Sequence, residues 1–362
     1  NNQKPPKKER IITLIATDEE RKPTSSSLYT DTKSRMTSHC HVLADRVTIE
    51  KHVKFFKEVT NGKRVLFVNG GTGIGILPFL CAKHGAGSVA VQDTSKIMDC
   101  VEEVARDNKE VSKNMTFHQK SVADLITELK GNSSDVSEDL KFDFIFVDWV
   151  SGLLTNDGTL IDALVESRDR LLRKTGQVMP DSAMLYATGI NDYEFYLSSI
   201  DWWSNVYGWK MEAMKEIVKT DPVDGSVPQH TIVTSGVKVA QVNALEVTRE
   251  NASYECVFSL CGTYPKTTIN FLTVYTQMTY GISGAKGFRL FSNPSDNGGV
   301  IQPISFLLPE FVPLSGQEKL HLKLNVQGKS GHKGAKVTIS GAYPSGDTQQ
   351  QFEESYRYAC YE

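Results

Sequence analysis

The feature that most constrains this chain is a short apolar run that ends in a glycine-rich turn. Residues 64–68 (RVLFV) precede the turn at residues 69–75 (NGGTGIG), and a helical pattern follows to about His84. In such a unit the glycines let the backbone approach a ligand, and the helix N-terminus supplies amide donors. The pattern favours a nucleotide-binding crevice, while a simple tight turn is the alternative that the glycines alone leave open.

Other segments of the first half alternate between strand and helix patterns. A helical stretch covers residues 42–56, and a strand at residues 88–92 (SVAVQ) is followed by a helix at residues 95–108. Residues 142–148 (FDFIFVD) form a third apolar run, and the polar segment 131–138 (GNSSDVSE) is expected to be a surface loop. This alternation predicts a Rossmann-like α/β domain with a parallel sheet.

The pattern changes after about residue 178. Strand-like runs recur there without long helices between them, which predicts an antiparallel β-barrel or sandwich at residues 179–362. A chain of 362 residues is long enough for two domains, so the α/β domain is expected at residues 28–178. A basic tail at residues 1–27 is expected to be disordered. The expected strands of the second domain lie at residues 232–234, 239–247, 254–260, 268–275, 304–308, 319–326 and 336–339.

Charge and cysteine usage exclude several classes of function. A net charge of −3 lacks the basic excess of a nucleic-acid-binding protein, and no apolar run approaches the ~20 residues of a membrane-spanning helix. The first residues lack the apolar core of a secretory signal, so a cytoplasmic location, or also a nuclear one, is expected. Six cysteines without disulfide or metal-ligand spacing predict free thiols and no metal site.

An aromatic-rich insert interrupts the second half at about residues 190–212. Its two adjacent tryptophans point in different directions on any helix, so one neighbouring element cannot easily bury both. Either the chain encloses this segment itself or the segment docks on a partner, and the density of aromatic side chains favours an interface. The candidate interface residues are Tyr193, Trp202, Trp203, Tyr207 and Trp209.

The end of the second strand lacks the carboxylate that nucleotide-binding folds commonly offer to the ribose hydroxyls. The residue there is Gln92, whose neutral amide can donate and accept but carries no charge. Asp93 follows directly, and in a regular strand its side chain points to the opposite face. A β-bulge would bring it back, so the sequence leaves the role of Asp93 open.

Residues 201–211 (DWWSNVYGWKM) closely resemble the dimerisation-arm segment of type I protein arginine methyltransferases. Other matches occur in the family's order, and the resemblance covers about residues 28–362. It implies a Rossmann-like methyltransferase domain followed by an antiparallel β-barrel domain with an inserted helical dimerisation arm. The other matching motifs are His39 with residues 42–45 (VLAD), Val65-Leu66 with Gly71-Thr72-Gly73, Asp148-Trp149, Met179-Pro180 and residues 355–357 (SYR).

Measured against the family pattern, the positions that bind S-adenosyl-L-methionine are mostly replaced. The remnants of the cofactor site are His39, Gly71, Gly73 and Gln92. The replacements are Thr48 for an arginine that binds the methionine carboxylate, Phe67 for an acid of the first strand, Asn69 for its glycine, Gln92 for the ribose-binding glutamate, Ala123 or alternatively Asp124 for an acid beside the adenine, and Lys33 for the second of two tyrosines, the first being Tyr29.

The acidic loop is altered as well. Family members place two glutamates nine residues apart to clamp the substrate guanidinium, and Asp148 and Asp157 keep this spacing with shorter side chains. The loss of one methylene from each pulls the carboxylate oxygens back by about a bond length, which loosens a positioned site. The Thr-His-Trp loop that closes the family's pocket is missing, and Gly298-Gly299-Val300 stands in its place.

These losses together favour a catalytically inactive paralogue, similar to the prozyme of kinetoplastid arginine methyltransferases. The leading hypothesis is a non-catalytic subunit that forms a heterodimer or higher hetero-oligomer with a catalytic paralogue and activates it on Arg/Gly-rich proteins. The partner, rather than this chain, is then expected to bind S-adenosyl-L-methionine. Two alternatives remain: a divergent active methyltransferase that uses Asp148 and Asp157, and a stand-alone binding module for Arg/Gly-rich proteins.

Overall fold

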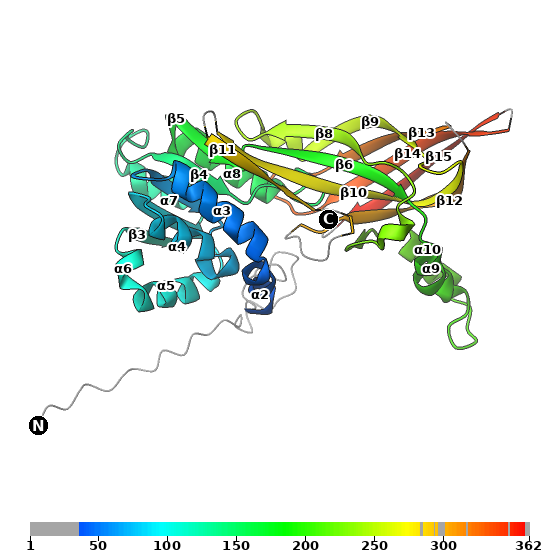
Figure 1. The fold of residues 1–362 in the computed structure, drawn as a ribbon, viewed down its shortest axis with the longest axis horizontal. Helices are drawn as coiled ribbons and strands as arrows, with labels where there is room; N and C mark the ends of the chain where they lie inside the picture. The colour runs from blue at the N-terminus through cyan, green and yellow to red at the C-terminus, as the bar shows by residue number, and fades with distance from the viewer. Residues whose placement is uncertain are drawn as a thin grey trace, which may run out of the picture. The chain divides into compact units, whose positions relative to one another are not determined.

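The computed structural model of the chain (Figure 1) describes residues 36–282, 285–292, 294–295, 301–315, 318–346 and 348–358. The tail expected at residues 1–27 lies outside these residues, as do Tyr29, Lys33 and Gly298-Gly299-Val300. The chain forms two compact units, Asn1–Leu125 and Ile126–Glu362. The division between the units therefore does not coincide with the domain boundary expected after residue 178.

The reason for this early division lies in contacts of helix α8 (Gly158–Leu171) with the β-rich part of the chain. Nη1 of Arg168 donates to the carbonyl oxygens of Ala244 at 3.0 Å and Val247 at 2.6 Å. Glu166 on the same helix forms an ion pair with Arg249 at 3.0 Å. These bonds join the last helix of the α/β pattern to the unit that contains the antiparallel strands.

The first unit contains three parallel strands in the order β3-β2-β1. The apolar runs at residues 64–68 and 88–92 are confirmed as β1 (Arg64–Val68) and β2 (Ser88–Asp93). The sequence gives no strong signal for β3 (Met115–Gln119), because only its first residue is fully buried. The helices are α2 (Met36–Ala44), α3 (Arg46–Val59), α4 (Ile76–Lys83), α5 (Ile97–Asp107), α6 (Lys109–Ser112) and the first residues of α7 (Val122–Lys130).

The core of this unit lies between its strands and helices. Val65, Leu66 and Val91 have no exposed surface, and Phe55 and Phe56 of α3 are buried with them. Burying side chains of this size contributes about 1.5–3 kcal/mol each. This core fixes the end of β1, from which the glycine turn begins.

The second unit begins with the parallel strands β4 (Phe142–Val147) and β5 (Leu172–Met179), with α8 between them in the chain. The third apolar run is thus confirmed as β4. The polar segment at residues 131–138 contains turns and bends but no strand or helix, so the expected loop is also confirmed. The Rossmann-like part of the prediction therefore agrees with the elements of both units.

Two antiparallel sheets follow in the second unit. One has the strand order β7-β12-β10-β6-β8 with β11 paired to β10, and the other has the order β15-β14-β13-β9. The prediction of a strand at residues 232–234 is wrong, because Ile232 and Thr234 form only isolated β-bridges. The strands are β6 (Ser182–Ile190), β7 (Val223–Asp224), β8 (Val237–Asn243), β9 (Ser253–Cys261), β10 (Lys266–Ile282), β11 (Ala285–Phe291), β12 (Ile304–Ser315), β13 (Lys319–Gln327), β14 (Ala335–Ser345) and β15 (Thr348–Tyr358).

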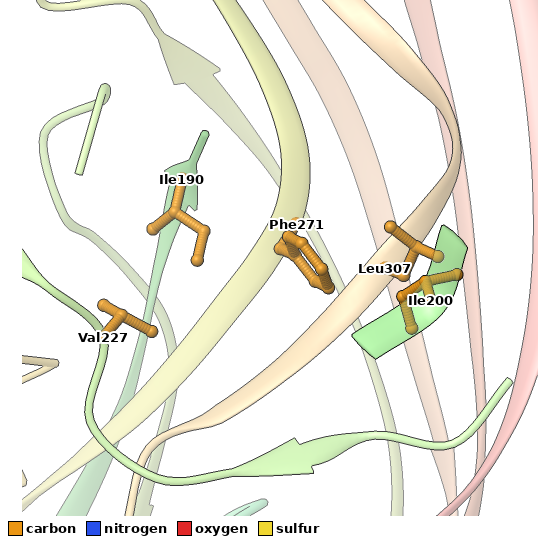
Figure 2. Packing of buried hydrophobic residues seen from close by; sticks show 5 residues of the cluster. All are labelled: Ile190, Ile200, Val227, Phe271 and Leu307. Carbon is orange, nitrogen blue, oxygen red and sulfur yellow. The ribbon is translucent and has the colours of Figure 1, made fainter. Parts of the chain in front are cut away.

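The aromatic insert forms a helical arm that follows β6 and continues beyond residue 212. In Figure 1 it extends away from the antiparallel strands of its own unit. Its base is fixed by a buried cluster in which Ile200 packs with Ile190, Phe271 and Leu307 of the strands and with Val227 (Figure 2). The elements of the arm are α9 (Tyr193–Phe195), η2 (Tyr196–Ile200), η3 (Asp201–Ser204) and α10 (Glu212–Lys219).

Candidate functional site

The glycine turn leaves β1 through left-handed backbone. Asn69 has a φ of +56°, and Gly73, Ile74 and Gly75 have φ values of +62°, +56° and +70°. Glycine adopts this conformation freely and asparagine tolerates it, whereas the β-branched Ile74 is held there at a cost of about 1–2 kcal/mol. The turn is also tightly packed, because a Cβ atom on Gly71 would lie 2.5 Å from a methyl carbon of Ile97.

Two neighbouring side chains at the end of β2 accept hydrogen bonds from this turn. Asn69 N donates to Gln92 Oε1 at 3.3 Å, and Gly71 N donates to Asp93 Oδ2 at 3.1 Å. The other carboxylate oxygen of Asp93 accepts from Ser95 N at 2.9 Å. Gln92 and Asp93 are both buried, so these two amides of the turn bond to the chain itself.

The pairing of β2 answers the question that the sequence leaves open about Asp93. Gln92 lies opposite His118 and Asp93 opposite Gln119 on β3, and no register shift interrupts this pairing. The chain therefore has no β-bulge at this position. Asp93 still reaches the turn because the turn passes over the end of β2, where Gly70 N donates to the carbonyl oxygen of Gln92 at 2.9 Å.

Helix α2 is joined to the same turn through His39. Its Nδ1 accepts a hydrogen bond from Gly73 N at 3.0 Å, which requires the proton of a neutral ring to be on Nε2. His39 is buried, and a Cβ atom on Gly73 would lie 2.9 Å from a methyl carbon of Val42. The structure thus brings together the four expected remnants of a cofactor site, His39, Gly71, Gly73 and Gln92.

The other positions that the resemblance assigns to the cofactor have structural roles in the first unit. Thr48 belongs to the first turn of α3, and its amide donates to the N-cap residue Asp45 at 3.0 Å. Phe67 is buried against an aromatic ring of α3. Asp124 is exposed and accepts from the hydroxyl of Ser121 at 2.7 Å. Thr48 and Phe67 therefore offer no charge to a ligand.

The two acids of the acidic loop, in the second unit, differ in their surroundings. Asp148 is exposed directly after β4. Asp157 is the N-cap of α8, and its Oδ1 accepts from Thr159 N at 2.9 Å, Leu160 N at 3.3 Å and the Thr159 hydroxyl at 2.6 Å. Asp157 thus stabilises a helix start, a role that its sequence position before Gly158 is compatible with.

The chain between these acids is packed closely. Trp149 is fully buried, and its Nε1 donates to the carbonyl oxygen of Pro180 at 3.0 Å. Oδ1 of Asn156 accepts from the hydroxyl of Ser151 at 2.6 Å and from Leu153 N at 3.1 Å. These bonds close the loop on itself within the second unit.

The arm exposes most of the aromatic side chains expected at an interface. Tyr207 is 94% exposed and Trp209 73%, and Tyr193 and Trp202 are also exposed, whereas Trp203 is half-buried. The rings of Trp202 and Trp203 meet edge to face at 5.1 Å between centroids. The chain therefore does not enclose this segment within the second unit.

An ion pair that the sequence analysis does not predict joins the start of η3 to α10. Lys215 Nζ donates to Asp201 Oδ1 at 2.6 Å and to the hydroxyl of Ser204 at 2.8 Å. The hydrogen bond from Lys215 lowers the pKa of Asp201, and the same bond raises the pKa of Lys215. No sequence signal marks this pair, because its members are separated by the turn at the tip of the arm.

Phe311 on β12 also contacts the arm, and the sequence gives no signal for this contact. Its ring lies edge-on to Tyr196 at 4.9 Å and to Tyr193 at 6.1 Å between centroids.

Within the described residues, no group of three or more His, Cys, Asp or Glu side chains could hold a metal ion. No helix in the same part of the chain is long and apolar enough to cross a membrane.

Comparisons with known proteins agree with this arrangement. Residues 181–335 match the family described as the arginine methyltransferase oligomerization subdomain. Protein arginine N-methyltransferase 1.1 of Arabidopsis thaliana is 30% identical over 241 residues, which cover 66% of this chain and 58% of that protein. The ribosomal protein arginine N-methyltransferase rmt3 of Schizosaccharomyces pombe is 31% identical over 244 residues, 66% of this chain and 42% of that protein. The chain thus spans between 42% and 58% of the length of these two relatives.

Solved structures show the same fold. A chain of the Trypanosoma brucei PRMT1 enzyme–prozyme heterotetrameric complex with AdoHcy superposes with a TM-score of 0.79 at 26% identity, covering 90% of this chain and 100% of that chain. Arabidopsis thaliana protein arginine methyltransferase 10 has a TM-score of 0.73 at 19% identity, covering 91% and 99%. The expected fold, a Rossmann-like part followed by antiparallel barrel-like sheets, is confirmed. By its fold and its sequence, this chain is similar to protein arginine methyltransferases.

Proposed function

We propose that this chain is a non-catalytic regulatory subunit, similar to a prozyme, that assembles with a catalytic protein arginine methyltransferase and activates it on Arg/Gly-rich proteins. The observation that carries this proposal lies at the end of β2. The position assigned to the ribose-binding acid holds Gln92, whose amide bonds to Asn69 N at 3.3 Å and to the carbonyl oxygen of Lys120 at 2.6 Å. The similarity to a chain of an enzyme–prozyme complex supports the same function.

Loss of charge explains why such a chain would not bind S-adenosyl-L-methionine. The resemblance assigns an arginine to the position of Thr48 and acids to those of Phe67 and Gln92, and none of the three carries a charge. A hydrogen bond to a charged group contributes about 2 kcal/mol. Losing three removes roughly 6 kcal/mol, a large part of the ~8 kcal/mol that binds a micromolar ligand. The catalytic partner then supplies the bound cofactor.

The acidic loop supports the absence of catalysis. A guanidinium clamp needs two carboxylates whose oxygens are free to accept bidentate hydrogen bonds. Oδ1 of Asp157 accepts three hydrogen bonds from the first turn of α8. Asp148 is exposed, and a carboxylate whose Oδ1 is bonded to the start of α8 cannot accept a bidentate guanidinium through both of its oxygens.

The arm is the surface that would join the two kinds of subunit. Exposed aromatic side chains of this density are typical of the centre of a protein interface, and Tyr207 and Trp209 provide them here. If the catalytic subunit binds this chain only in its active conformation, the binding free energy shifts the catalytic subunit toward that conformation. The proposed partner is a catalytic paralogue, in a heterodimer or higher hetero-oligomer, and the proposed location is the cytoplasm.

Isothermal titration of S-adenosyl-L-methionine tests the proposal directly. The cofactor is titrated into this chain alone, into the catalytic paralogue alone and into their complex. We expect no binding to this chain, and in the complex only the number of sites that the catalytic subunits contribute. Micromolar binding to the isolated chain would contradict the account of the lost charges.

Methyl transfer from labelled cofactor to an Arg/Gly-rich peptide separates the remaining alternatives. We expect no transfer by this chain alone and a higher rate from the complex than from the catalytic paralogue. Transfer by this chain alone would make it a divergent enzyme that uses Asp148 and Asp157. A stable homodimer that binds the peptide, but neither binds nor activates the paralogue, would make it a stand-alone binding module.

A further inference from the structure

In a nucleotide-binding site, backbone amides of the glycine turn donate hydrogen bonds to the ligand. In this chain, three amides of the turn in the first unit donate to side chains of the chain itself. The amides of Asn69, Gly71 and Gly73 donate to side chains at distances between 3.0 and 3.3 Å. The three acceptor residues, His39, Gln92 and Asp93, are 4%, 1% and 1% exposed. A ligand that used these amides would have to displace buried side chains rather than water.

Gln92 bonds to both neighbours of its own strand. Its Oε1 accepts from Asn69, directly after β1, and its Nε2 donates to the carbonyl oxygen of Lys120, directly after β3. Only a side chain that both donates and accepts can make this bridge. A glutamate could accept from Asn69, but its carboxylate would repel the Lys120 oxygen, which lies 2.6 Å from Nε2.

Asp93 forms the second bridge, through its carboxylate. Its two carboxylate oxygens accept from Gly71 N at 3.1 Å and from Ser95 N at 2.9 Å. Hydrogen bonds to an ionised acceptor are stronger than those between neutral groups. A negative group thus already lies against the turn, where it would also repel the phosphate or carboxylate of an incoming ligand.

From these contacts we infer that Gln92 and Asp93 are internal ligands of the glycine turn, which hold it in one conformation without a cofactor and close it to a nucleoside. This inference deepens the proposed regulatory function and rests on it. The chain then has an ordered first unit in the absence of S-adenosyl-L-methionine. The side chain at the ribose position stabilises the fold instead of binding a ligand.

Hydrogen–deuterium exchange of the full chain, followed in peptides that cover residues 69–75, tests this inference. In the natural sequence we expect slow exchange of the turn amides without cofactor, and no change when S-adenosylhomocysteine is added at millimolar concentration. Exchange at the rate of an unstructured peptide, or slowing by the added compound, would overturn the inference. This measurement needs no variant and so does not depend on a variant that folds.

A pair of matched variants tests the bridge itself. Gln92→Glu removes the donor to Lys120. Gln119→Glu makes the same chemical change on β3, where Gln119 is exposed and donates to the carbonyl oxygen of Ser95 at 3.2 Å. We expect about tenfold faster exchange of the turn in Gln92→Glu, because local opening becomes easier, and no change in Gln119→Glu. Equal exchange in both variants would refute the bridging role.

The outcomes separate this inference from the proposed function. If the chain activates a catalytic paralogue but the turn exchanges equally in Gln92→Glu and Gln119→Glu, the inference fails and the regulatory function stands. If the turn is protected through Gln92 but the chain neither binds nor activates the paralogue, the proposed function fails instead.

Discussion

The carboxylate of Asp157 accepts a hydrogen bond from the backbone amide of Thr159 at 2.9 Å, and this bond closes the first turn of α8. The family pattern assigns the same side chain to a substrate clamp. Oδ1 also accepts from Leu160 N and from the Thr159 hydroxyl, so all three of these bonds hold one carboxylate oxygen at the start of α8. In this chain Asp157 is the N-cap of α8.

Substitution of Asp157 should therefore affect stability. Asp157→Ala is expected to lower the free energy of unfolding by about 1 kcal/mol, the usual cost of losing an N-cap side chain. Urea denaturation of the isolated chain measures this, and Asp157→Ser should retain most of the stability. Asp148→Ala, at an exposed position with no helix to cap, is the control and should cost less. An unchanged midpoint for Asp157→Ala would show that the cap is unimportant.

Truncation of the arm's aromatic side chains should weaken assembly with the catalytic paralogue. Tyr207 and Trp209 are 94% and 73% exposed, so Tyr207→Ala and Trp209→Ala should leave the stability of the isolated chain nearly unchanged. Interface aromatics of this type contribute about 2 kcal/mol or more, which corresponds to roughly thirtyfold in the dissociation constant. Sedimentation or titration of the complex measures the effect. Tyr264→Ala, another exposed aromatic outside the arm, should bind normally, and equal losses at Tyr264 would argue against the arm.

The ion pair within the arm should depend on acid pH. The hydrogen bond from Lys215 lowers the pKa of Asp201 below its ordinary value of 3.8, so the pair's contribution is present above that value and is lost as the pH falls through the lower, folded-state pKa. At neutral pH, Lys215→Ala should loosen the arm and accelerate hydrogen exchange in residues 201–219. Lys219→Ala, whose partner Glu216 is exposed, is the matched control. Equal exchange in the two variants would exclude the proposed role of Lys215.

His52 predicts a pH dependence of the first unit. Burial lowers the pKa of this imidazole from 6.5 to about 4, and its Nδ1 bonds to the carbonyl oxygen of Thr48 at 2.9 Å. The unfolded chain therefore binds a proton below about pH 6.5 that the folded chain does not bind until about pH 4. Stability is retained above pH 6.5 and falls by up to about 3 kcal/mol as the pH approaches 4. In His52→Gln the slope between pH 6.5 and 4 should be shallower, as measured by denaturation at several pH values. His321→Gln, at an exposed site on β13, changes the same residue type without removing a buried imidazole and is the control.

Some elements could be predicted from sequence because their signal is local. β1 and β4 are continuous apolar runs, and both strands are buried along nearly their whole length. β3 has no such run, and its side chains are mostly half-buried or exposed. The residues at 232–234 resemble a strand in composition, yet only isolated bridges form there. A short apolar run shows that side chains are buried, and it does not show which backbone partners are available.

The arm illustrates the same limit for side-chain packing. Its sequence predicts aromatic side chains on a helical insert, and the structure shows Tyr207 and Trp209 exposed. The anchoring of the arm depends on Phe311 and Phe271, which come from strands far along the chain. Their contacts with Tyr196 and Phe195 arise only when β10 and β12 pair in the same sheet.

The sequence by itself determined which chemical groups this chain possesses. Thr48, Phe67 and Gln92 carry no charge in any conformation, so the prediction that a charged cofactor site is lost rests on residue identity alone. Only the tertiary structure decided what those side chains do instead. Gln92 and Lys120 are separated by 28 residues, and Gln92 and Asn69 by 23. Hydrogen bonds act only over about 3 Å, so these partners exist only after three strands align and bring their ends together.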